Sequence, residues 1–116
     1  MKSACIIPLM LAIPAFADDA SIEAVKVTKS GESWNFSVTL LHEDTGWDDY
    51  ADGWRIVLED GTEIGYRKLF HPHVNEQPFT RSLGGVEISH DTKRVYVEAS
   101  TSTDGWGAAR FAVDLK

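Results

Sequence analysis

The chain has 116 residues, of which 43% are hydrophobic, and its 18 acidic residues outweigh 11 Lys and Arg to give a net charge of −7. A chain of this length can bury one hydrophobic core, so we expect a single domain. The negative charge argues against nucleic acid or an anionic membrane as partner, because both recruit patches of Lys and Arg.

The first 17 residues are typical of a Sec-type signal peptide. An apolar run at residues 6–13 is followed by Ala15-Phe16-Ala17, which matches the small-x-small pattern of a cleavage site. We predict cleavage after Ala17, a mature domain of residues 18–116, and a periplasmic or secreted location. The single cysteine leaves with the signal peptide, so no disulfide is expected.

The rest of the sequence alternates short apolar and polar runs with turn-forming clusters, as all-β sandwiches do. Side chains alternate across a strand, which places Trp34, Phe36, Val38 and Leu40 on one face of residues 33–41. We predict strands at residues 21–28, 33–41, 54–59, 62–67, 79–88, 94–100 and 109–115. The expected fold is all-β: a single antiparallel β-sandwich of about seven strands.

Glycine and proline mark the connections between these strands. Asp60-Gly61 predicts a tight hairpin turn, and Gly84-Gly85 predicts a bulge or kink. Residues 42–53 are expected to form an acidic loop. Residues 69–78 are expected to form an ordered loop or edge segment, because their two prolines cannot donate to a β-ladder. The last two strands and their Gly-Trp-Gly connection resemble the end of a fibronectin type III domain, in the wider class of immunoglobulin-like sandwiches.

Three unusual stretches fall in expected loops, where function concentrates. They are HEDTGWDDYADGW (residues 42–54), LFHPHVNEQPFTRSL (residues 69–83) and TDGWG (residues 103–107). Together with an Asp-Gly-Thr turn, they resemble an uncharacterised family of small exported bacterial β-sandwich proteins. The similarity extends over nearly the whole mature chain, and the HPHVNEQPFTRSL string is its most specific part.

The resemblance implies an exported β-sandwich and brings no established activity. Members of that family often carry histidine where this chain has Asp49. They also often carry a His-Gly-aromatic sequence where this chain has Asp104-Gly105-Trp106. If the family uses a histidine-rich metal site, these departures imply a weaker or different site here.

The segment His71-Pro72-His73 indicates a metal site on its own terms. In an extended segment, residues i and i+2 project to the same side, so both imidazoles can reach one cation. Glu76, or His42 from the preceding loop, supplies a further ligand. Imidazole and carboxylate suit Zn²⁺ or Cu²⁺. The alternative is two exposed loop histidines with a proline that shapes the backbone.

The acidic loop suggests a second cation site. Asp44, Asp48, Asp49 and Asp52 lie close in sequence, and Ca²⁺ takes carboxylate ligands from such loops. Their spacing does not match an EF-hand. The alternative is that aspartate and glycine form tight turns by hydrogen bonding to their own backbone.

Aromatic residues in the loops indicate a partner-binding surface. Trp47, Phe70 and Trp106 would contact another periplasmic protein or a glycan, since exposed aromatic side chains are enriched at interfaces. Alternatively, Trp47 and Trp106 plug the open ends of the sandwich.

None of the sequence signatures of catalysis is present, so we do not expect an enzyme. The leading hypothesis is an exported, non-catalytic binding module whose loop histidines hold Cu²⁺ or Zn²⁺. The first alternative is a periplasmic interaction or structural module without a metal. The second is a sandwich stabilised by Ca²⁺ at the acidic loop.

Overall fold

The computed structural model describes residues 18–115, which form strands and connecting loops. The predicted signal peptide lies outside the described residues. Within them, no helix is long and apolar enough to cross a membrane. The strands are β1 (Ser21–Ser30), β2 (Ser33–Leu41), β3 (Ala51–Val57), β4 (Glu63–Lys68), β5 (Phe79–Val86), β6 (Arg94–Thr101), β7 (Gly105–Trp106) and β8 (Phe111–Asp114).

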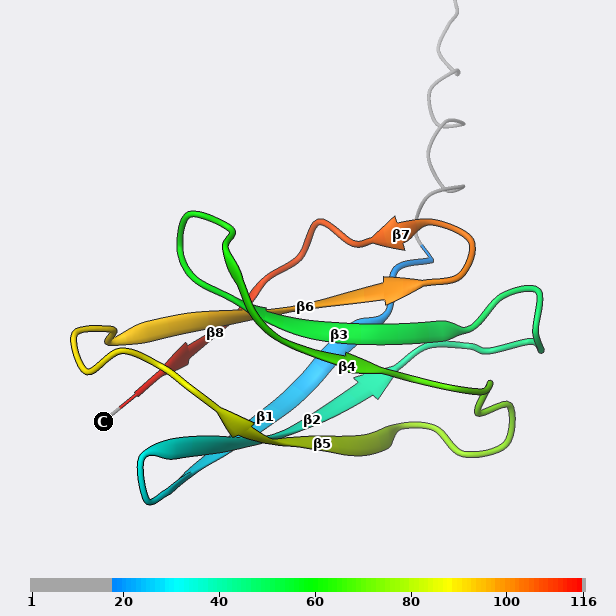
Figure 1. Ribbon diagram of the computed structural model, residues 1–116. Helices are drawn as coiled ribbons and strands as arrows, with labels where there is room; N and C mark the ends of the chain where they lie inside the picture. The colour runs from blue at the N-terminus through cyan, green and yellow to red at the C-terminus, as the bar shows by residue number, and fades with distance from the viewer. Residues whose placement is uncertain (1–17, 116) are drawn as a thin grey trace, which may run out of the picture.

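Two antiparallel sheets face each other, as Figure 1 shows. One has three strands in the order β1-β2-β5, and the other has five, in the order β4-β3-β6-β7 with β8 also paired to β6. Every pairing is antiparallel. The all-β prediction is confirmed.

The alternation predicted for β2 decides which side chains enter the core. Phe36, Val38 and Leu40 are at most 1% exposed, and Trp34 packs half-buried at the edge of the same core. The intervening hydroxyls point outward to β5, where the Oγ atoms of Ser37 and Ser82 lie 2.7 Å apart. Period-two burial therefore organises the three-stranded sheet.

Two glycine predictions are confirmed. Gly61 closes the β3–β4 hairpin at a φ of 93°, and Gly85 has a φ of 71°. Between β2 and β5 the pairing shifts from Phe36 opposite Leu83 to Trp34 opposite Val86, so β5 has one extra residue at the Gly84-Gly85 bulge. Positive φ favours glycine at both the turn and the bulge because glycine lacks a Cβ atom.

Most predicted strands begin or end within a few residues of the observed ones, and three differences concern the segments around β3, β7 and β8. Strand β3 begins at Ala51 rather than residue 54, because pairing with β6 extends to Thr101. The segment expected only to connect the last two strands contains β7, which pairs with the end of β6. Strand β8 begins at Phe111 rather than residue 109. Cross-strand hydrogen bonds determine where each strand begins and ends. These bonds depend on the partner strand, which local sequence does not reveal.

Glu98 of β6 bridges two arginines on the outer face of the five-stranded sheet. Its residue exposure is 8%, and its carboxylate accepts hydrogen bonds from Arg55 Nε at 2.9 Å and Arg110 Nε at 2.8 Å. Arg55 also lies over the ring of Trp106, 3.9 Å from its centroid. Burial opposes the charge of Glu98, but the bonds from Arg110 and Arg55 outweigh it and hold its pKa below the usual 4.5.

This network predicts an acid-sensitive contribution to stability. A depressed carboxyl pKa stabilises the fold at pH values above the unfolded pKa, and the contribution is lost as pH falls below 4.5 through the folded value. We expect Glu98→Gln to lower the free energy of unfolding by about 1–3 kcal/mol at pH 7. The deficit should shrink toward pH 3 in urea denaturation. An unchanged deficit across this range would contradict the assignment.

Candidate metal centre

Three loops and the start of the described chain meet at one end of the sandwich, on the right in Figure 1. We call this the loop end, made of residue 18, the β2–β3 loop (42–50), the β4–β5 loop (69–78) and the β6–β7 turn (102–104). Side chains join these segments directly. The backbone N–H of His42 donates to Gln77 Oε1 at 2.9 Å, and Thr103 Oγ1 donates to Asp49 Oδ1 at 3.2 Å.

Asp44 lies at the centre of the loop end. Its side chain is 0% exposed and accepts three hydrogen bonds. These come from His42 Nδ1 at 2.7 Å, the backbone N–H of Ala51 at 3.0 Å and the backbone N–H of His73 at 2.8 Å. One buried carboxylate therefore orients the His42 ring and ties the β4–β5 loop to the start of β3.

Local backbone turns bring these groups together. The N–H of Asp44 donates to the carbonyl of His42 at 2.8 Å, which folds the carboxylate back toward the ring of His42. Further along, Thr45 N–H donates to the carbonyl of Asp49, and Asp49 N–H donates to the carbonyl of Gly46. Gly46 has a φ of 146°, which favours glycine. The second turn returns Asp49 toward His42.

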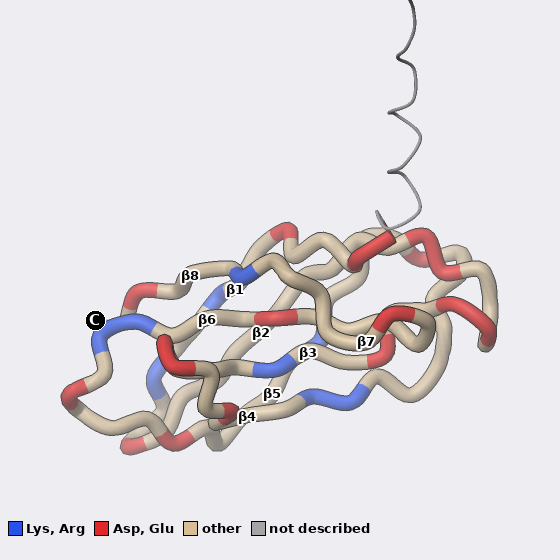
Figure 2. Tube along the Cα trace, turned by 90° about the horizontal axis from the view of Figure 1, so that it is seen from above, with Lys and Arg blue, Asp and Glu red and all other residues tan. Residues whose placement is uncertain are grey.

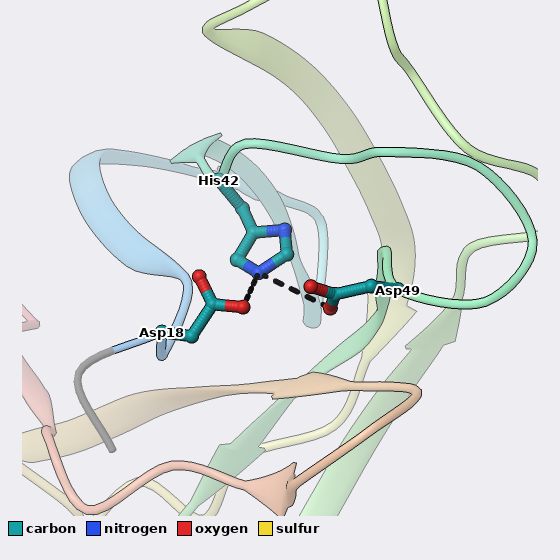
Figure 3. A group of neighbouring side chains, drawn as sticks. All are labelled: Asp18, His42 and Asp49. Carbon is teal, nitrogen blue, oxygen red and sulfur yellow. Dashed lines mark ion pairs between the residues drawn. The ribbon is translucent and has the colours of Figure 1, made fainter. Parts of the chain in front are cut away.

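The free nitrogen of His42 points between two carboxylates (Figure 3). His42 Nε2 lies 3.5 Å from Asp18 Oδ2 and 3.7 Å from Asp49 Oδ1, and the His42 side chain is 1% exposed. Those separations exceed good hydrogen-bond lengths, and Nε2 has no hydrogen-bond partner. Within residues 18–115, Asp18, His42 and Asp49 are the group of His, Cys, Asp or Glu residues whose ligand atoms converge, all within 4.8 Å.

The electrostatics of this group favour a cation. The neighbouring Asp49 carboxyl, followed by burial, raises the pKa of Asp18. Burial opposes protonation of His42, but the bond to Asp44 and the negative charges of Asp18, Asp44 and Asp49 outweigh it and raise the His42 pKa above 6.5. Convergent carboxylates repel one another, and a proton or a metal ion between them relieves this repulsion.

The cluster opens to solvent. A surface hollow beside it is lined by Asp18, Leu41, His42, Val74 and Gln77, among other residues. The side chain of Asp18 is 46% exposed and that of Asp49 is 23% exposed, so an ion can reach both carboxylates. Acidic residues lie around this end in Figure 2, as they also do at the opposite end of the sandwich.

The histidines of the β4–β5 loop have other partners. His73 stacks on Phe79, with ring centroids 4.0 Å apart, and its Nε2 accepts a hydrogen bond from Arg81 Nη2 at 2.8 Å. Burial, Arg81 and His71 lower the pKa of His73, so its ring is neutral. The centroids of the His71 and His73 rings lie 4.8 Å apart.

Glu76 pairs with Arg81 at 3.6 Å. Asp44 connects the backbone of His73 to the ring of His42, so the predicted ligands share one end of the molecule. Of the four residues predicted to bind Cu²⁺ or Zn²⁺, His42 alone belongs to the convergent group.

The carboxylates of the acidic loop are divided among different partners. Asp44 bonds to His42 and to backbone N–H groups, Asp49 faces His42, and Asp52 accepts a hydrogen bond from the Ser100 hydroxyl. Asp48 is exposed at the tip of the turn. Of these four, Asp49 alone contributes to the convergent group.

The loop aromatics are exposed and do not plug the sandwich. Trp47 is 66% exposed, Phe70 is 65% exposed and Trp106 is 38% exposed. They make separate contacts: Trp47 packs edge-on against Tyr50, and Trp106 packs against Tyr66 and Arg55 on the outer sheet face. Leu41 and Val74 add exposed apolar surface beside the hollow.

Sequence reasoning missed Asp18, because its ligand partners lie far along the chain. Its position directly after the predicted cleavage site was the available signal. It also missed Gln77, which accepts from His42 N–H and donates to the carbonyl of His73 at 3.1 Å. Both contacts depend on how the sheets bring the loops together.

Comparison with known proteins finds a relative of about twice this length. A protein of Halomicrobium mukohataei named "Putative lipoprotein" is 37% identical over 95 residues, which make up 82% of this chain and 46% of that protein. This chain therefore spans about half the length of the relative that it matches. No family model matches the chain, and no solved structure is significantly similar to it.

Proposed function

We propose that this protein is an exported binding module that holds one divalent transition-metal ion at Asp18, His42 and Asp49. The observation that carries this proposal is the buried Nε2 of His42, which has no hydrogen-bond partner and points between two carboxylate oxygens. Buried polar atoms normally have partners, and a metal ion bound between Nε2 and the two carboxylates would supply one.

The spacing of the three ligand atoms supports a metal. Bonds of about 2.0–2.2 Å at tetrahedral angles separate neighbouring ligand atoms by about 3.4 Å. The separations of 3.5 and 3.7 Å from Nε2 to the two carboxylates are close to that value. A direct hydrogen bond would need a shorter distance of about 2.7–3.2 Å.

The hydrogen bond from His42 to Asp44 supports the same proposal. Histidines that bind metals almost always donate their other ring N–H to a carboxylate or carbonyl, which fixes the tautomer. His42 Nδ1 donates to the fully buried Asp44, so Nε2 is the ring nitrogen that faces Asp18 and Asp49 and would bind a metal in place of a proton. Asp44 would therefore position the ligand without touching the metal.

The ligand types favour Zn²⁺ or Cu²⁺. Imidazole suits these ions, whereas Ca²⁺ takes six to eight oxygen ligands. Two carboxylates also balance the charge of a divalent ion.

Export is supported by the predicted signal peptide and by the similarity to a protein named as a lipoprotein. The two facing antiparallel sheets support an immunoglobulin-like or fibronectin-like sandwich.

Thermal melting with added metal tests this function. A ligand at about 100 times its Kd adds about 2.7 kcal/mol to the free energy of unfolding. For a domain of this size, we expect Zn²⁺ or Cu²⁺ to raise the Tm of the mature chain by about 10–20 °C. His42→Ala and Asp49→Asn should abolish most of the shift, and Ca²⁺ should produce little.

Two control variants locate the site. His90 is 83% exposed in its side chain, so His90→Ala should retain the full shift. His71→Ala should also retain it if the metal lies at Asp18, His42 and Asp49. Loss of the shift in His71→Ala, together with retention in Asp49→Asn, would move the ion to the β4–β5 loop. The absence of any metal-dependent shift in the wild-type chain would overturn the proposed function.

A further inference from the structure

One member of the proposed site has a special place in the sequence. Asp18 directly follows Ala15-Phe16-Ala17, the predicted cleavage site, and its carboxylate lies 3.5 Å from His42 Nε2. Cleavage after Ala17 would therefore create a new chain terminus on a residue of the metal cluster. The described strands run from Ser21 to Asp114, so a chain beginning at Asp18 contains all of them.

Processing changes the chemistry of the Asp18 nitrogen. In the precursor it belongs to a peptide bond, whose resonance withdraws its lone pair, so it is a poor metal ligand. After cleavage it becomes a primary amine, which can donate a lone pair. An α-amino group and the side-chain carboxylate of the same aspartate can close a six-membered chelate ring around one ion, so both donors come from a residue already at the site.

Three side-chain ligands do not complete a four-coordinate site. Four-coordinate Zn²⁺ sites with three protein ligands keep one position open. Asp18 is the most exposed of the three, with 46% of its side chain accessible, and it lines the hollow beside the cluster. His42, by contrast, is fixed by Asp44 on its far side and cannot move to fill that position.

We propose that signal-peptide cleavage completes the metal site by freeing the α-amino group of Asp18 as its fourth ligand. This inference rests on the proposed metal site at Asp18, His42 and Asp49. It makes tight metal loading a property of the exported, processed chain. The precursor retains only the three side-chain ligands and binds the same ion more weakly.

A matched pair of chains tests the inference. One begins at Asp18 with a free amine, and the other has the same residues with that amine acetylated, which restores an amide as in the precursor. Circular dichroism should first establish that both chains are folded. Calorimetric titration with Zn²⁺ should give at least about 10-fold weaker binding for the acetylated chain, since losing even an outer-shell partner of a metal site costs 10–100-fold.

A spectroscopic measurement identifies the nitrogen itself. With ¹⁵N-labelled aspartate, the Cu²⁺ electron paramagnetic resonance signal of the free-amine chain should show direct coupling to ¹⁵N. The acetylated chain should lack this coupling. Mass spectrometry of the full chain after export should also find Asp18 at the terminus.

The outcomes separate this inference from the proposed function. Equal affinity in the two chains, or a processed terminus other than Asp18, would overturn the role of the amine and leave the three-side-chain site standing. Absence of Zn²⁺ and Cu²⁺ binding in both chains would overturn the proposed function, and this inference with it. Weaker binding after acetylation together with ¹⁵N coupling supports both.

Discussion

Replacing Asp44 with alanine is expected to lower the free energy of unfolding by about 3–5 kcal/mol, because one partner of a buried charged pair disappears. The Asp44 carboxylate is fully buried and accepts from His42 Nδ1 and from the backbone N–H groups of Ala51 and His73. Alanine leaves all three donors without this acceptor. Domain stabilities total only about 5–15 kcal/mol, so urea denaturation should show a large displacement of the midpoint.

Asp44→Asn gives a second measurement if the alanine variant does not fold. Its amide oxygen can still accept from His42 and Ala51, but its NH₂ group would face the N–H of His73. We expect a loss of about 1–3 kcal/mol and a metal affinity weaker by about 10–100-fold. Asp48→Ala is the matched control, because Asp48 is exposed in the same loop. A loss in Asp48→Ala as large as that in Asp44→Ala would contradict the central role of Asp44.

Trp54→Ala is the second substitution with a large expected effect. Trp54 is 0% exposed, the largest of the fully buried side chains, and it sits in β3 between β4 and β6. Truncation removes the transfer free energy of the indole and leaves a cavity between the sheets. We expect the free energy of unfolding to fall by about 3–5 kcal/mol. Circular dichroism should follow the urea transition, because the substitution also changes tryptophan fluorescence.

Trp54→Phe separates the effect of side-chain volume on stability from that of the buried indole N–H. The indole Nε1 of Trp54 is buried without a hydrogen-bond partner, so phenylalanine removes an unsatisfied donor while keeping an aromatic ring. Its loss should be smaller than that of alanine, about 1–2 kcal/mol. Trp47→Ala should change stability by less than about 0.5 kcal/mol, since Trp47 is 66% exposed. An effect of Trp47→Ala equal to that of Trp54→Ala would contradict this account of the core.

Local patterns in the sequence were enough to predict the fold class and most of the strands. Alternating burial in residues 33–41 follows from the geometry of an extended chain, so the spacing of Phe36, Val38 and Leu40 is enough to assign them to the core. The hairpin at Gly61 and the bulge at Gly85 were equally local, because a backbone with positive φ favours glycine. Patterns with a period of two residues need no knowledge of distant partners.

The candidate metal site, by contrast, depends on contacts between segments that are distant in sequence. Asp18 and His42 are far apart in sequence, and no local pattern indicates that the Asp18 carboxylate lies 3.5 Å from the His42 ring. The hydrogen bond from Arg81 to His73 is likewise set by the position of β5 beside its loop. Loop side chains obey no repeating spacing, so their convergence depends on how the two sheets stack and on which buried carboxylate holds the loops together.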